Sequence, residues 1–248
     1  MGAPLDDITF HIHSPYANNS PEYREQTSLQ NFVGDLYLQK MRGYKPPHTG
    51  RINLLSSNPV TTYSFWKIGS IVSILIDFNR DLYESLDEYG RCRYLLDIIQ
   101  TAMFQLTEAY NWDWSVFERA YQEILDSNFA FKLDTPSKKS RDGKKAGWLS
   151  IEKTKTVTTV YAHVQYESTI LKVRLLEKEN GWWYDYAYLL AKHAKWKDGE
   201  RFGVFYVEGA LEIYYSLAHN RLFLLQEGEE VQAIDYEKLS RRVPRVHL

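Results

Sequence analysis

Two histidines near the start of the chain have a spacing that a metal site would use. His11 and His13 alternate within the segment 8–13, which has the pattern of a strand, so their side chains project from one face. A zinc site needs further protein ligands. Those available nearby are Asp6, Asp7 and His48. Because no His-x-x-x-His or Cys-x-x-Cys pairing accompanies them, we interpret both histidines as strand residues and expect no metal and no cofactor.

The chain offers one cysteine as a nucleophile. Cys92 lies between Arg91 and Arg93, whose guanidinium groups would lower the pKa of the thiol. No histidine is near it in sequence, and the Gly-x-Ser-x-Gly elbow of serine hydrolases is absent. Glycine-rich phosphate loops are absent as well. We therefore interpret Cys92 as structural and expect a protein that is not an enzyme.

Charged side chains form several clusters, which we interpret as solvated surface. The acidic ones are Glu84, Asp87 and Glu88, followed late in the chain by Glu227, Glu229 and Glu230. The basic ones are Lys138, Lys139, Arg141, Lys144 and Lys145, with Arg241, Arg242 and Arg245 near the end. The basic clusters lack the interleaved aromatic residues of a single-strand binder. With 30 basic and 32 acidic residues, the chain also lacks the positive excess of a general nucleic-acid binder, so we expect no nucleic-acid partner.

The most regular pattern in the sequence is a pair of helices between residues 91 and 126. Apolar residues recur every three or four positions up to Tyr110, which is typical of a helix with one buried face. The segment Asn111–Asp113 then interrupts the pattern, and Asp113 is a good N-cap for a second helix that carries Phe117 and Ile124. Both helices need a common apolar partner, which strands elsewhere in the chain would supply.

The remaining elements predict an α+β protein. We expect strands at 8–13, 52–55, 61–65 and 69–78, the last buried on both faces. The apolar set from Leu29 onwards fits a helix, although 36–38 would suit a strand as well. After a strand at 128–133, residues 135–147 read as an exposed basic loop. Later strands are expected at 151–154, 156–166, 169–177, 182–191, 201–207, 211–217 and 222–225. Asn180-Gly181 and Asp198-Gly199 are expected to form turns, and 235–242 a short helix.

These elements divide the chain in two. We predict an α+β sub-domain at 1–134 that contains the helix pair, the loop at 135–147, and an antiparallel β-meander at 148–248. The short separations between the later strands favour antiparallel pairing of neighbours. Whether the two parts form one domain or share a sheet stays open.

Residues 63–133 resemble the immunity proteins of bacterial polymorphic toxin systems. The matching motifs are Ile76-Asp77-Phe78-Asn79, Leu82-Tyr83-Glu84, Leu95-Leu96, and Tyr110-Asn111-Trp112-Asp113 followed by Phe117, Ala120 and Tyr121. The resemblance implies a non-enzymatic protein that binds a cognate toxin protein and neutralises it, usually by covering the active site. It transfers no binding residues to this chain.

Two other functions are compatible with the sequence. One is an enzyme or small-ligand-binding protein whose site lies in the C-terminal β half and uses His163 and His193. The other is a structural subunit of a bacterial assembly. The absence of a signal peptide and of an apolar run of about 18 residues leads us to expect a cytoplasmic protein without a membrane partner.

Overall fold

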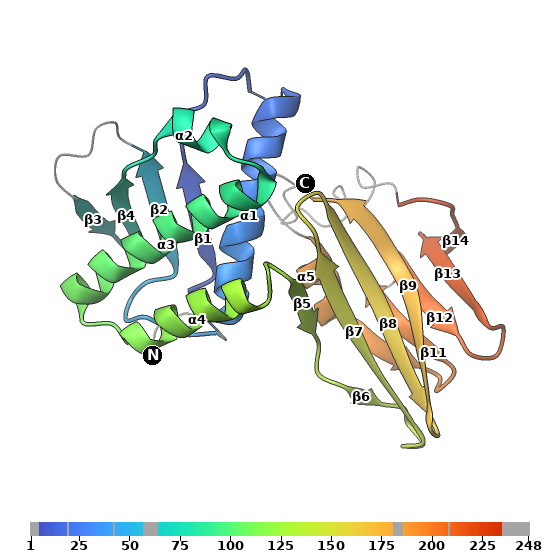
Figure 1. The fold of residues 1–248 in the computed structure, drawn as a ribbon. Coiled ribbons are helices and arrows are strands. Elements are labelled where there is room, and N and C mark those ends of the chain that lie inside the picture. The colour runs from blue at the N-terminus through green and yellow to red at the C-terminus, as the bar shows by residue number, and fades with distance from the viewer. Residues whose placement is uncertain are drawn as a thin grey trace. The chain divides into compact units, whose positions relative to one another are not determined.

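The computed structural model describes residues 5–18, 20–41, 43–56, 64–180, 186–207 and 209–234. The chain divides into two compact units, Met1–Ala130 and Phe131–Leu248 (Figure 1). The first combines strands with helices and the second is mostly antiparallel sheet, so the predicted α+β class is confirmed. Each unit is described by itself below.

The first unit is built on a four-stranded sheet. Its strands are β1 (Asp7–His11), β2 (Arg51–Ser56), β3 (Phe65–Ile68) and β4 (Ile71–Ile76). They lie in the order β1-β2-β4-β3, with β1, β2 and β4 parallel and β3 antiparallel to β4. Parallel pairing brings the carboxyl ends of β1, β2 and β4 to the same edge of the sheet. The expected strand at 61–65 lies mostly outside the described residues, and the strand observed there begins at Phe65.

Four helices accompany this sheet. They are α1 (Pro21–Lys40), α2 (Arg80–Ser85), α3 (Glu88–Tyr110) and α4 (Trp114–Asp126). The predicted helix pair is confirmed as α3 and α4. Asn111 ends α3 in the left-handed conformation, with a φ of 53°, and the Asp113 carboxylate caps α4 by accepting from the Ser115 amide at 3.0 Å. None of the helices in the described part of the chain has the length and apolarity that a membrane crossing requires.

The helix α1 begins eight residues earlier than the apolar pattern indicates. Ser20 is its N-cap and Pro21 is its first residue, which is where proline fits a helix best. Its first two turns are polar and contain the buried Gln26. Because the sequence pattern relies on apolar residues, it detects the helix only from Leu29.

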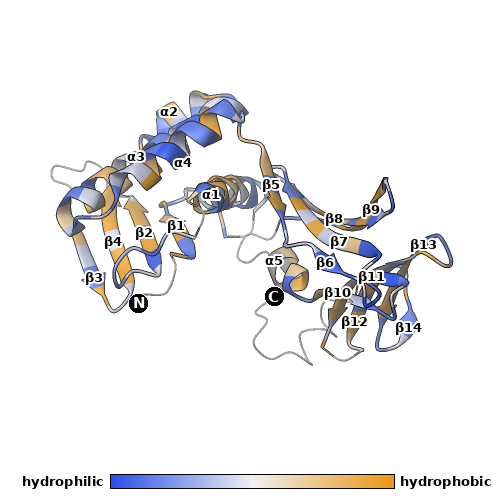
Figure 2. Cartoon of the chain, turned by 90° about the horizontal axis from the view of Figure 1, so that it is seen from below, coloured by the Kyte–Doolittle hydropathy of each residue, from blue (hydrophilic) through white to orange (hydrophobic). Residues whose placement is uncertain are grey.

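One face of the sheet carries the core of the first unit. Fully buried side chains alternate along the strands, among them Ile52, Leu54, Val72 and Ile74. The close packing of α1 on β1 is set by Gly34, where a Cβ atom would lie 3.0 Å from the carbonyl oxygen of Ile8. Figure 2 shows α3 and α4 on one side of the four strands.

The expectation that β4 is buried on both faces is only partly right, because on its second face Ser73 alone is buried, at 8% exposed. Its alternate residues Val72, Ile74 and Ile76 are at most 3% exposed, but Ile71 is 36% exposed and Leu75 is half-buried. The apolar run in the sequence reflects one helix-covered face and one apolar face that the described helices leave open.

The second unit contains two antiparallel sheets. The first comprises β5 (Phe131–Asp134), β7 (Lys145–Lys153), β8 (Val157–Tyr166) and β9 (Thr169–Glu179) in that order, with β6 (Lys138–Lys139) paired to β7. The second is a meander of β10 (Ala194–Lys197), β11 (Arg201–Tyr206), β12 (Leu211–Ser216), β13 (Arg221–Gln226) and β14 (Glu229–Glu230). The helix α5 (Tyr186–Lys192) precedes β10.

The two sheets of this unit contact each other through β7, β8 and β9 on one side and β10, β11 and β12 on the other. Gly147 of β7 marks the closest approach, because a Cβ atom there would lie only 2.6 Å from the ring of Phe202 in β11. Phe202 itself is fully buried. The core between the sheets therefore depends on the ring of Phe202, which packs directly against the backbone of Gly147.

Several expectations for the second half need correction. Residues 135–147 are not a free loop, because β6 and the start of β7 pair there and bury Ser140. Residues 131–134 belong with the second unit, since β5 pairs with β7. Residues 186–192 are helical rather than extended, and β10 was not expected. The Asp198-Gly199 turn is confirmed between β10 and β11. Gly181 and residues 235–242 lie outside the described residues.

The helix layer of the first unit is joined by a partly buried chain of hydrogen bonds. Tyr37 of α1 is fully buried, and its hydroxyl donates to Gln100 Oε1 of α3 at 2.6 Å. The amide of Gln100 then donates to Glu118 of α4 at 3.2 Å. Three helices are thereby linked through a single side chain from each.

Tyr37→Phe tests this link. The change keeps the ring but leaves the Gln100 acceptor without its donor, so we expect the free energy of unfolding to fall by about 1–2 kcal/mol. Urea denaturation measures it. In Tyr16→Phe, which removes a hydroxyl bonded to Glu84 at the surface, the midpoint should barely move. Equal effects of the two variants would contradict the assignment.

Gly203→Ala tests the packing of the second unit. A Cβ atom at Gly203 would collide with backbone atoms, lying 2.6 Å from Tyr214 Cα. Backbone cannot move aside as a flexible side chain can, so we expect a loss of at least about 1–3 kcal/mol in the free energy of unfolding. The matched control is Gly50→Ala, where the nearest atom is 3.8 Å away and the stability should change little.

Candidate functional site

A hollow in the first unit is lined by residues at the carboxyl ends of β1 and β2 and in the first half of α1. Figure 1 shows where these elements lie. The volume of the hollow is about 390 Å³. It is lined by Phe10, His11, Ile12, His13, Tyr23, Gln26, Thr27, Gln30 and Ser56. In sheets with parallel strands, ligands commonly bind outside the carboxyl ends, so the position suits a binding site.

Two glutamines one helical turn apart form the inner wall of this hollow. Gln26 is 7% exposed and Gln30 is 4% exposed. The Nε2 atom of Gln30 is buried and has no hydrogen-bond partner. Native proteins pair the large majority of their buried polar groups, so an unpaired amide at the wall of a hollow needs an explanation.

The rim of the hollow is fixed by hydrogen bonds from neighbouring segments. The backbone amide of His13 donates to Ser56 Oγ at 3.1 Å, which ties the ends of β1 and β2 together. The guanidinium of Arg80 donates to the carbonyl of His13 and also pairs with Glu84 at 3.4 Å. These charges lie outside the hollow, whose described lining contains no Asp, Glu, Lys or Arg.

The histidines considered for a metal do line this hollow, but Asp7, one of the further ligands considered, is engaged elsewhere. Asp7 pairs with Arg51 at 2.6 Å and accepts from the hydroxyl of Thr9 at 2.8 Å. Within the described ranges, no group of three or more His, Cys, Asp and Glu residues is arranged to hold a metal ion. His11 and His13 are therefore better treated as polar, aromatic wall residues.

A second feature of the first unit is an exposed apolar surface on the β3–β4 hairpin, which we call the hairpin patch. It consists of Trp66, Ile68 and Ile71, whose exposed fractions are 42%, 72% and 36%. Ile68 lies opposite Ile71, and Trp66 lies opposite Ser73, so all three project from the face that the described helices leave open. On β3, which is an edge strand, the charge of Lys67 is turned to the other face, over the ring of Tyr110.

The second unit holds a serine–histidine pair with the spacing of a nucleophile and its base. Ser150 Oγ lies 2.8 Å from His163 Nε2, and the imidazole stacks on Trp148 with ring centroids 5.0 Å apart. However, Ser150 has no exposed surface and His163 is 8% exposed. A substrate has no access to such a hydroxyl, so the pair fits a buried structural contact.

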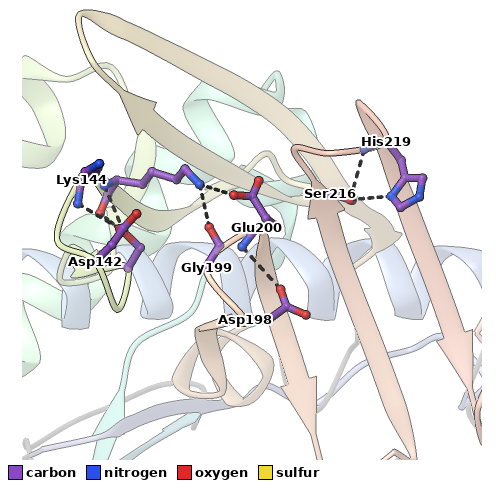
Figure 3. Close-up of polar contacts among 9 residues, drawn as sticks. Asp142, Lys144, Asp198, Gly199, Glu200, Ser216 and His219 are labelled. Atoms are coloured by element: carbon purple, nitrogen blue, oxygen red, sulfur yellow. Dashed lines mark hydrogen bonds and ion pairs between the residues drawn. The ribbon is translucent and has the colours of Figure 1, made fainter.

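A shallower hollow of about 580 Å³ lies on the second sheet of this unit. It is lined by Asp198, Glu200, Arg201, Tyr214, Ser216, Ala218, His219, Arg221 and Phe223. Its polar groups bond to one another. Arg201 pairs with Asp198. Ser216 Oγ lies 3.0 Å from His219 Nδ1 (Figure 3). A network that is already satisfied internally offers little to a ligand.

The basic cluster at 138–145 is also held by local contacts. The ammonium group of Lys145 pairs with Glu200 and donates to the carbonyl of Gly199. Asp142 accepts from the backbone amide of Lys144 at 3.1 Å and from Ser140 Oγ at 2.6 Å, and these bonds lower its pKa. These contacts give the cluster a structural role in closing the hairpin between β6 and β7.

Cys92 and the two histidines of the β half do not assemble into a site. Burial raises the pKa of the Cys92 thiol to about 12, which overrides any effect of the adjacent arginines; these instead bond to Tyr83 and Asp97. His193 contacts the ring of Tyr206, with centroids 4.8 Å apart. Neither His163 nor His193 lines either of the two hollows described above.

Sequence reasoning found His11 and His13 but missed Gln26, Gln30 and the hairpin patch. The sequence alone does not indicate that a glutamine in a polar helical turn is buried, because its burial depends on which part of the protein the helix packs against. The patch had a weak signal in the alternation of residues 65–68 before Gly69, which adopts a φ of +60°. Comparisons with protein-family models, with curated proteins and with solved structures gave no match to this chain.

The stability of the fold should decrease in mild acid. Burial lowers the pKa of His163 and of His193 below the ordinary value of 6.5, whereas the unfolded chain titrates near that value. Below about pH 6.5 the unfolded state therefore binds more protons, and the free energy of unfolding falls as the pH drops from 7.5 to 5.5. Denaturation series at the two pH values measure this change.

His163→Gln should make that decrease smaller, because its amide replaces the imidazole without a titrating group. The exposed His48, replaced by Asn, serves as the control and should leave the pH dependence unchanged. An unaltered slope in His163→Gln would show that other groups cause the acid sensitivity.

Proposed function

We propose that this protein acts by binding another protein through the hairpin patch, and that it neutralises a cognate bacterial toxin in the manner of the immunity proteins that residues 63–133 resemble. The observation that carries the proposal is the grouping of Trp66, Ile68 and Ile71 on an open face at the edge of a sheet. Scattered exposed apolar residues are ordinary, whereas adjacent ones at a sheet edge are typical of interaction surfaces.

The edge of β3 supports a specific way of binding. On the side away from β4, its backbone amides and carbonyls have no partner strand within the described residues. A segment of the toxin can add to this edge as a further strand, with main-chain hydrogen bonds supplying affinity. Trp66 and Ile68 then cover apolar side chains of that segment. Each large side chain that becomes fully buried stabilises the complex by about 1.5–3 kcal/mol.

The partner is accordingly a protein segment of alternating apolar residues rather than a charged polymer. The charged side chain next to the patch, that of Lys67, does not interfere with the binding of an apolar segment. Its ammonium group donates to Thr49 Oγ1 at 3.2 Å and contacts the ring of Tyr110. Inhibition is stoichiometric and needs no catalytic group. Such a protein acts where the toxin is made, in the cytoplasm of the producing cell, without nucleic-acid or membrane partners.

Ile68→Glu tests the surface. Ile68 is 72% exposed, so the substitution should leave the thermal midpoint almost unchanged. It buries a carboxylate in the interface, and we expect the affinity for the toxin to fall at least about thirtyfold, the effect of losing a hot spot. The matched control is Ile170→Glu, which changes a 54% exposed isoleucine on β9 of the other unit and should bind as the wild type does.

The partner to use is the product of the adjacent upstream gene, co-expressed with the wild type and with each variant. Rescue of growth by the wild type and by Ile170→Glu, together with failure of Ile68→Glu, is the expected result. If the wild type neither binds nor protects, the toxin assignment is wrong. If Ile68→Glu protects fully, the toxin binds elsewhere on the molecule.

The alternative of a structural subunit makes a different prediction for the same patch. A structural subunit would pair its β3 edge with that of a second copy of the chain. In light scattering the wild type would then be a stable dimer, and the Ile68→Glu variant would be a monomer. A toxin-binding protein whose patch awaits a foreign partner should have the monomer mass of 29.2 kDa in both cases.

A further inference from the structure

The hollow at the carboxyl ends of β1 and β2 has a property that the proposed function does not use. Gln30 is 4% exposed, lines the hollow, and holds a buried Nε2 group without a partner. A leucine or methionine at this position of α1 would fill the same space with no polar group to satisfy. The amide therefore costs stability in the empty protein, which is the expected signature of a residue kept for binding.

The lining of the hollow selects the class of ligand. It contains two glutamine amides, the hydroxyl groups of Tyr23, Thr27 and Ser56, and two imidazoles, but no Asp, Glu, Lys or Arg among its described residues. An anion such as a phosphate would lack a permanent positive charge to pair with, and a cation would lack a carboxylate. The ligand that fits is neutral and presents hydrogen-bond donors and acceptors.

Glutamine side chains are well suited to recognise the hydrogen-bonding edge of a neutral nucleobase. The amide offers a donor and an acceptor side by side, which pairs in a bidentate manner with a nucleobase edge such as that of adenine. Gln26 and Gln30 lie four residues apart on α1 and therefore line the same wall of the hollow. Phe10 and Tyr23 are also among the lining residues, and an aromatic ring supplies a flat surface on which a base can stack.

We propose that this hollow binds a neutral nucleobase or nucleoside. The buried Gln30 side chain changes rotamer so that its amide donates to an acceptor on the edge of the base, and an aromatic ring of the wall covers the face of the base. A volume of about 390 Å³ falls in the range usual for small-ligand pockets. The described contacts also preorganise the opening, because His13 is tied to Ser56 at 3.1 Å before any ligand arrives. This binding is independent of the hairpin patch.

The test uses the full chain with adenosine, guanosine, cytidine and uridine as separate probes. Calorimetric titration and thermal unfolding should show saturable binding of at least one nucleoside to the wild type. Gln30→Leu should bind that nucleoside at least tenfold more weakly. Without ligand, the same variant should unfold at the wild-type temperature or above it, since it removes an unpaired buried amide.

A matched glutamine separates this role from a structural one. Gln100→Leu, also on a helix of the first unit, breaks the bond from Tyr37 and should unfold at a lower temperature while it binds the nucleoside as the wild type does. In spectra of the ¹⁵N-labelled wild type, the side-chain amide signal that is missing from Gln30→Leu should shift on titration.

Three results would overturn the proposal: no nucleoside binds the wild type, Gln30→Leu binds as tightly as the wild type, or Gln30→Leu is destabilised as Gln100→Leu is. The last result would mean that the amide is satisfied by water in a purely structural role. Ile68→Glu should retain nucleoside binding, so a failure of this proposal is distinguishable from a failure of the toxin-binding function.

Discussion

The first unit depends on the burial of one face of its sheet under α1, α3 and α4. Val72 and Ile74 are fully buried on that face, and the chain from Tyr37 through Gln100 to Glu118 joins the three helices above it. The helices that follow β4 are committed to this side, since α3 runs directly into α4 through the Asn111–Asp113 turn. Among the described residues, no helix covers the opposite face and no strand pairs with the outer edge of β3, and the hairpin patch follows from that asymmetry.

The helix pair was predictable because its signals are local. The spacing of Leu95, Ile99 and Leu106 and the capping of α4 by Asp113 are contained in short stretches of sequence. The same holds for the strands around Ile52 and Val72, for the antiparallel order of the last meander, and for the Asp198-Gly199 turn. These features require only the periodicity of a helix or strand and the chemistry of a turn.

The features that escaped prediction depend on contacts between distant segments. The first turns of α1 are polar, and only docking on β1 buries Gln26 and Gln30. The lysine-rich segment was predicted to be a loop, but β6 pairs with β7 within it. The distant Glu200, which pairs with Lys145, helps to hold it in place. The thiol of Cys92 has adjacent arginines in sequence, yet its pKa is set by burial. In each case the tertiary environment outweighs the composition of the segment.

The orientation of Lys67 has a consequence for how the purified protein would behave. A charged side chain that points outward commonly protects an edge strand from pairing with other strands. The only charged residue of β3 is Lys67, and its ammonium group instead contacts Tyr110 and Thr49. Among the described residues, the feature that limits pairing with other strands is the short length of β3, which has four residues. Occupation of this edge by a bound partner would cover it, so we expect the complex to be more soluble than the protein alone.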